Sequence, residues 1–171
     1  MAIDGTLYTS GNGLTYTLYN STDGGFSWAY TGEVKDNIVA LATAPNDASI
    51  IYYATSSNVY KSTDTGNSFT KLSVNPRGAD SNNIEITSID IALLDNNYII
   101  AVGARDTDSL ECSGVYILDE NKPFTNWIDT NIGSYDAYAI AFSPNFASDQ
   151  QIVAVITNET DTMVTTKMGS S

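Results

Sequence analysis

The chain has 171 residues, 42% of them hydrophobic and 16% charged, which is typical of one globular domain and unlike a disordered or membrane-spanning chain. Twenty acidic residues against seven basic ones give a net charge of −13. This charge repels nucleic-acid phosphates and anionic lipids, so neither nucleic-acid partners nor membrane insertion are expected. Fifteen of the acids are Asp, which favours turns, and residues that favour strands and turns are abundant. The composition therefore predicts an all-β fold.

Alternating and β-branched runs, separated by turn residues, predict strands in four successive groups. The predicted strands are residues 6–10, 15–20 and 28–31, then 38–44, 50–55, 59–62 and 69–73, then 86–93, 98–103, 114–118 and 125–129, and finally 138–143, 151–157 and 162–167. The apolar run at 89–94 is too short for periodicity to separate a strand from a helix. No helix longer than about two turns is expected.

These groups define one predicted domain, residues 1–168, with residues 169–171 as a tail. Its four units are residues 5–32, 37–73, 85–130 and 136–168. The first unit lacks an innermost strand and the last lacks an outermost one. Because unpaired sheet edges promote association, we expect other protein chains or further copies of this chain to complete the fold.

One octapeptide occurs twice, 41 residues apart, each time between two predicted strands. Residues 21–28 read STDGGFSW and residues 62–69 read STDTGNSF, and both fit S-x-D-x-G-x-x-aromatic. The Asp accepts backbone N–H groups, the Gly supplies a positive φ, and the aromatic is expected to fold back as an apolar plug between sheets. The predicted structural residues are Ser21, Asp23, Gly25, Trp28, Ser62, Asp64, Gly66 and Phe69. The pattern predicts a rigid hairpin that needs no substrate.

The two octapeptides resemble Asp-box (BNR-type) repeats. These mark the hairpins of sialidase-like, xyloglucanase-like and sortilin-like β-propellers and of bacterial surface proteins with such repeats. The resemblance implies a β-propeller of four-stranded antiparallel blades, with three to four blades present. It also implies that these residues are structural and lie on the side opposite an active site.

The residue types give little support to enzymatic chemistry, and no catalytic residue is predicted. The chain has no His, which removes a Cys–His nucleophile, and only Arg77 and Arg105 where a sialidase-like site needs three arginines. A glycoside hydrolase needs only two carboxylates. Asp36 and Asp136 precede predicted inner strands, where they would line a central site.

An acidic insertion after the second strand of the third unit is a candidate calcium site. Asp106, Asp108 and Glu111 supply the oxygen ligands that Ca²⁺ prefers, although their spacing is not that of an EF-hand. An exposed loop without metal is the alternative. No other cofactor is predicted, and Cys112 is expected to pack as a small hydrophobe.

Asn20 and Asn158 begin glycosylation sequons, and together with a Lys-poor, Asn/Ser/Thr-rich composition they favour an extracellular or cell-surface location. Seven tyrosines in the first sixty residues fit either a glycan- or protein-binding face or ordinary cross-strand pairs. The expected function is a non-catalytic structural or interaction module. The alternative is part of a glycoside hydrolase or a glycan-binding, lectin-like propeller.

Overall fold

The computed structural model describes residues 1–76, 83–108, 111–122, 126–158 and 160–168. These residues form fourteen strands and one short helix. The strands pair into four antiparallel sheets, and each sheet is built from strands that follow one another along the chain. Among the described residues, no helix has the length and apolar character needed to cross a membrane.

The first two sheets come from the N-terminal half. Sheet 1 has the order β1 (Leu7–Ser10), β2 (Leu18–Ser21), β3 (Ala29–Tyr30). Sheet 2 has the order β4 (Ala40–Thr43), β5 (Ile51–Ala54), β6 (Val59–Ser62), β7 (Thr70–Lys71). Strands β1, β2 and β3 match β5, β6 and β7 in register, because Leu7 pairs with Ser21 as Ile51 pairs with Ser62.

The other two sheets come from the C-terminal half. Sheet 3 has the order β8 (Ile84–Leu94), β9 (Asn97–Asp106), β10 (Gly114–Asp119), β11 (Ile128–Asp129). Sheet 4 has the order β12 (Asp136–Phe142), β13 (Gln151–Thr157), β14 (Thr162–Met168).

Each predicted strand has a counterpart in the structure, with differences at the ends. Strands β8 and β9 are longer than predicted because Glu85 and Arg105 pair across them and form an ion pair with an N–O distance of 2.6 Å. The ambiguous run at 89–94 is part of β8. The predicted strand at 125–129 is reduced to β11, and residue 125 lies outside the described part of the chain.

The helix α1 (Phe146–Asp149) is a single turn between β12 and β13. It lies in a segment for which no helix was predicted, and it is shorter than the expected limit. Its buried Phe146 packs edge-on against Phe142, with ring centroids 4.4 Å apart. The aromatic pair holds this helical turn against the end of β12.

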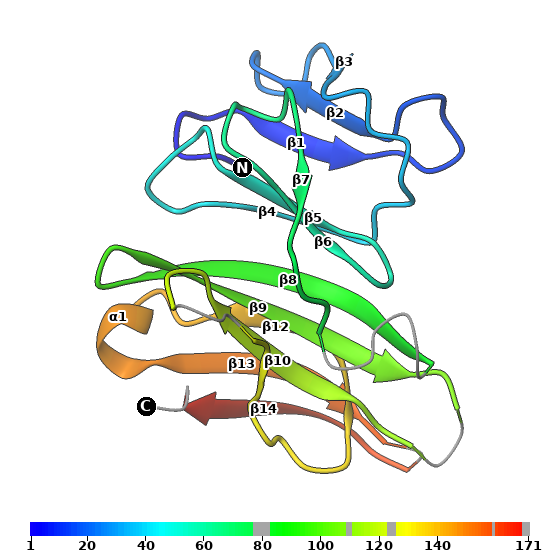
Figure 1. The fold of residues 1–171 in the computed structure, drawn as a ribbon, viewed down its shortest axis with the longest axis vertical. Coiled ribbons are helices and arrows are strands. Elements are labelled where there is room, and N and C mark those ends of the chain that lie inside the picture. The colour runs from blue at the N-terminus through cyan, green and yellow to red at the C-terminus, as the bar shows by residue number, and fades with distance from the viewer. Residues whose placement is uncertain (77–82, 109–110, 123–125, 159, 169–171) are drawn as a thin grey trace.

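The four sheets stack face to face as an open series, with sheet 1 and sheet 4 at opposite ends (Figure 1). Three buried clusters lie between consecutive sheets. The largest joins sheets 2 and 3 and contains Tyr52, Ile86 and Ile100. Since each cluster is shared by two neighbouring sheets, the core is a set of inter-sheet layers.

The inner strands of sheets 3 and 4 are also joined by hydrogen bonds. The hydroxyl of Thr87, at a bulge in β8, donates to the Ala137 carbonyl at 2.6 Å. The Asp90 carboxylate accepts the Phe142 backbone N–H at 2.7 Å, and burial raises the pKa of this carboxyl group. These bonds fix β12 beside β8.

Candidate functional site

The first octapeptide forms a turn closed by its own side chains. Ser21 donates to Asp23 at 2.7 Å and accepts the Gly25 backbone N–H at 2.9 Å. The Asp23 carboxylate accepts the Ser27 backbone N–H at 2.9 Å and the Ser27 hydroxyl at 2.6 Å. The turn between β2 and β3 is therefore held without help from the rest of the chain.

The second octapeptide repeats this set of bonds between β6 and β7. Ser62 donates to Asp64 at 2.7 Å and accepts the Gly66 N–H at 2.9 Å. The Asp64 carboxylate accepts the Ser68 N–H at 2.9 Å and the Ser68 hydroxyl at 2.6 Å. Both glycines have the positive φ that the pattern predicts, +93° for Gly25 and +83° for Gly66.

These hydrogen bonds stabilise the ionised form of both aspartates. Bonds from the hydroxyl and the N–H of Ser68 lower the pKa of Asp64 to about 2. The equivalent bonds from Ser27 hold the pKa of Asp23 well below its usual range. Both carboxylates are charged at neutral pH and are used within their own turns.

The two aromatic residues of the octapeptides differ in burial. Phe69 packs against the cluster between sheets 1 and 2 and lies edge-on to Tyr53, at 4.8 Å between ring centroids. Trp28 is 43% exposed, and its indole N–H donates to the carbonyl of Gly25 at 3.1 Å. In the single chain Trp28 therefore does not lie between two sheets, because no sheet in the described residues covers that side of sheet 1.

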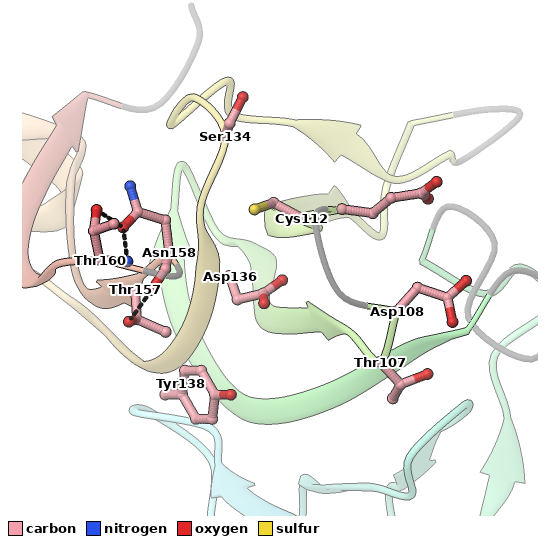
Figure 2. Close-up of a pocket in the computed structure, with 10 residues that line it drawn as sticks. Thr107, Asp108, Cys112, Ser134, Asp136, Tyr138, Thr157, Asn158 and Thr160 are labelled. Atoms are coloured by element: carbon pink, nitrogen blue, oxygen red, sulfur yellow. Dashed lines mark hydrogen bonds between the residues drawn. The ribbon is translucent and has the colours of Figure 1, made fainter.

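A pocket of about 590 Å³ lies where sheets 3 and 4 meet. Its walls are the turns after β9 and β13 and the start of β12 (Figure 2). In an antiparallel blade successive turns alternate between two ends. The pocket turns join the second and third strands of their sheets, whereas the second octapeptide joins the third and fourth strands of sheet 2. The first octapeptide joins β2 and β3, which are equivalent in register to that pair. The pocket therefore opens at the end of a blade opposite to the octapeptide turns.

The pocket is lined by hydroxyl, carboxylate, amide and phenol groups, with one thiol. The lining residues are Thr107, Asp108, Glu111, Cys112, Ser134, Asp136, Tyr138, Thr157, Asn158 and Thr160. None of them is Lys or Arg. The pocket is thus acidic and rich in hydrogen-bonding groups, which suits a neutral polyhydroxylated ligand or a cationic group better than an anion.

Asp136 stands between the two walls of the pocket (Figure 2). One of its carboxylate oxygens accepts the backbone N–H of Asp106 at 2.8 Å and that of Ser113 at 2.9 Å. The side chain thereby ties the start of β12 to the turn between β9 and β10. This tether is a structural use of the carboxylate within the pocket.

Asp36, the other predicted carboxylate, does not line this pocket. It accepts the phenol of Tyr53 at 2.6 Å, and its carbonyl accepts the hydroxyl of Thr17 at 2.7 Å. Asp36 therefore joins sheet 2 to the connection that follows sheet 1. Arg77 lies outside the described residues.

The predicted calcium ligands do not converge in the described residues, where no group of three or more His, Cys, Asp or Glu side chains is arranged to hold a metal. Asp106 accepts the backbone N–H of Asp108 at 2.8 Å, and Asp108 accepts the side-chain amide of Asn83 at 2.7 Å. Glu111 lines the pocket, but residues 109–110 between them are not described. A calcium site here stays a prediction.

The two sequon asparagines lie in different settings. Asn20 is half-buried in the middle strand of sheet 1, where it pairs with both neighbours. Asn158 lies in the turn between β13 and β14 at the pocket, and its side-chain oxygen accepts the N–H groups of Thr160 and Asp161 at 2.9 and 2.8 Å. Asn158 is also half-buried, but of the two asparagines only it lies in a turn, the setting that suits glycosylation.

A charged cluster that sequence reasoning missed joins sheets 2 and 3. Lys61 and Glu120 form an ion pair, and the phenol of Tyr52 donates to the same carboxylate at 2.9 Å. The Lys61 ammonium also lies 5.4 Å from the ring centroids of Tyr52 and Tyr98. Burial, followed by the nearby Glu120 charge, raises the pKa of Tyr52. The cluster links sheet 2 to sheet 3 through an ion pair, a hydrogen bond and cation–π contacts.

The stacked antiparallel sheets of three or four strands define the class of fold, and comparison with known proteins agrees with it. No protein-family model and no curated protein matches the chain. Among solved structures, the chain is similar to an ancestral GH74 enzyme, with 20% identity and a TM-score of 0.64. The match covers 96% of this chain and 21% of the enzyme chain.

A second similar structure is YCF48 from Cyanidioschyzon merolae, with 13% identity, a TM-score of 0.38, and coverage of 89% of this chain and 63% of that one. At 20% identity, the similarity to the GH74 enzyme speaks to fold alone. The predicted all-β propeller fold is confirmed in the form of a partial propeller with four blade-like sheets. The chain spans about a fifth of the length of the GH74 enzyme.

Proposed function

We propose that the chain is a segment of an Asp-box β-propeller that acts outside the cell or at its surface as a non-catalytic interaction module. In this proposal a further β-sheet packs on the open face of sheet 4. The repeated turn bonds of the two octapeptides support the Asp-box assignment. The position of the sequon residue Asn158 in a turn supports the location.

The observation that carries the proposal is a pair of equivalent valines with opposite exposure. Ala54 pairs with Val59 in sheet 2, and Val155 pairs with Val164 in sheet 4. Val59 is 1% exposed because sheet 3 covers it, whereas Val164 is 69% exposed.

The same equivalence extends across the face. Ala40 and Ala42 of β4 pack against the cluster shared with sheet 3, whereas Ala139 and Ala141 of β12, 99 residues later, are exposed. Ala139 pairs with Val155 and Ala141 with Val153, so these residues share one apolar face with Val164. We call residues 139, 141, 153, 155 and 164 the sheet-4 face. Burying such a face releases about 25 cal/mol per Å², which favours association.

Sedimentation velocity at micromolar concentration tests the proposal. The wild-type chain is expected to sediment as an associated species, and Val164→Lys is expected to shift it to the monomer by placing a charge on the sheet-4 face. Ile128→Lys is the matched control, since Ile128 is 42% exposed but lies on the outer strand of sheet 3. A monodisperse 18.3 kDa wild-type monomer contradicts the proposal.

The second candidate function is glycan binding or hydrolysis at the pocket between sheets 3 and 4. The hydroxyl and carboxylate lining and the Tyr138 ring favour it, because sugars bind through hydrogen bonds and aromatic stacking. A glycan array combined with a hydrolysis screen, with Tyr138→Ala as the pocket variant, separates the candidates. Binding without turnover indicates a lectin-like module and turnover indicates a hydrolase. If the chain neither binds a glycan nor hydrolyses one, the result favours the interaction module.

A further inference from the structure

We propose that the sheet-4 face binds sheet 1 of a second copy of this chain in a head-to-tail contact. This inference rests on the proposed function, which requires only that some β-sheet covers sheet 4. It adds the identity of the partner and the surface that the partner uses.

Sheet 1 presents the complementary half of an inter-sheet contact. Ile51, Tyr60 and Phe69 of sheet 2 face sheet 1, where Ile51 is fully buried and the two rings pack on the shared cluster. Their equivalents in register, Leu7, Tyr19 and Trp28, lie on the side of sheet 1 that faces away from sheet 2. We call Leu7, Thr9, Tyr19, Trp28 and Tyr30 the sheet-1 face.

Aromatic residues dominate the sheet-1 face. Tyr30 pairs with Tyr19 across β2 and β3, and its ring stacks on Tyr16 at 4.5 Å between centroids. Trp28 and Tyr30 are 43% and 53% exposed, so the face is available to a partner. Exposed aromatic rings grouped in this way are typical of protein contact surfaces.

The two faces fit each other in side-chain size. The sheet-4 face carries Ala and Val, whereas the sheet-1 face carries Leu, Tyr and Trp. Within the chain, the small residues Ala40, Ala42 and Ala54 of sheet 2 already pack against the larger Ile86 and Ile89 of sheet 3. Small residues facing large ones interdigitate at native density, whereas two sheet-4 faces would leave voids.

Because the two faces are different patches of one surface, the contact is heterologous. Such a contact builds rings or open filaments instead of a two-fold dimer. The net charge of −13 on each copy opposes the contact. Screening by salt weakens this repulsion, so association is expected to increase with ionic strength.

Two variants that each block one face test the direction of the contact by sedimentation velocity. Val164→Lys blocks the sheet-4 face and Thr9→Lys blocks the sheet-1 face, and both positions are exposed in the single chain. Each variant alone is expected to be monomeric. An equimolar mixture is expected to form a dimer and nothing larger, because one intact sheet-4 face then meets one intact sheet-1 face.

The other outcomes separate this inference from the proposed function. If Val164→Lys is monomeric while Thr9→Lys still associates, sheet 4 binds something other than sheet 1 and the head-to-tail contact is wrong. If both variants are monomeric and their mixture stays monomeric, the contact is also wrong. If the wild-type chain is monomeric at all salt concentrations, or Val164→Lys associates like wild type, the proposed function fails as well. Far-UV circular dichroism confirms that each variant keeps the wild-type fold.

Discussion

The two octapeptide turns have the same internal hydrogen bonds and different surroundings. At residues 62–69, the hydroxyl of Thr31 donates to the Gly66 carbonyl at 3.0 Å, and Phe69 packs in the layer between sheets 1 and 2. At residues 21–28, the Gly25 carbonyl accepts the indole N–H of the exposed Trp28. The octapeptide therefore determines the turn, and the neighbouring sheet determines whether its aromatic residue is buried.

The largest effect is expected where the first sheet approaches the second turn. A Cβ on Gly32 would lie 2.5 Å from the backbone oxygen of Gly66, and Gly32 has a φ of +67°. Gly32→Ala should lower the free energy of unfolding by on the order of 3 kcal/mol, measured by urea denaturation. Gly24→Ala is the matched control, because its φ is +75° but a Cβ meets nothing within 4 Å. A cost of only about 1 kcal/mol is expected there, and equal costs would contradict the close approach.

The aromatic residues give the next largest difference. Phe69→Ala should cost about 2–3 kcal/mol, less than a fully buried Phe, because its ring is half-buried against Tyr53. Trp28→Ala should cost less than Phe69→Ala in the dilute chain, because solvent already reaches the indole. Thermal or urea unfolding measures both. A larger loss for Trp28→Ala than for Phe69→Ala would mean that the first turn is as covered as the second.

The smallest effect is expected in the dependence of folding stability on acidic pH. The pKa of Asp64 is about 2 in the folded chain, against about 3.9 for an unfolded Asp, so its ionised form favours folding. This contribution is fully present above about pH 4 and is lost as the pH falls towards about 2.

Melting curves of wild type and Asp64→Asn across this pH range check the acid dependence. Wild type should melt at a higher temperature than Asp64→Asn at pH 7, and the two melting temperatures should converge near pH 2. Asp95→Asn, in the turn between β8 and β9, removes the same charge and serves as the control. A difference in melting temperature between wild type and Asp64→Asn that does not depend on pH would contradict the lowered pKa of Asp64.

Strand positions could be predicted because each strand carries its own pattern. Runs such as residues 50–55 and 151–157 alternate or are β-branched between turn residues, and β5 and β13 lie within them. The turn residues of the octapeptides were predictable for the same reason, since the bonds of Asp23 and Asp64 join residues no more than four apart.

Features shared by distant segments were not predictable. The pocket draws Asp108 and Thr160 from turns of two different sheets and Asp136 from the start of β12. The ion pair of Lys61 and Glu120 joins residues 59 apart, and no periodic signal marks it. The exposure of Trp28 depends on whether a sheet lies beside it, which the octapeptide itself does not encode.

Acrylamide quenching of Trp28 fluorescence tests most directly whether a neighbouring sheet decides the burial of the turn aromatic. Trp127→Phe removes the chain's other Trp and its hydrogen bond to the Val74 carbonyl, leaving Trp28 as the reporter. Strong quenching is expected in dilute solution and shielding at concentrations where copies associate, because sheet 4 of a second copy then covers the sheet-1 face. Quenching that does not change with concentration while the chain associates would contradict it.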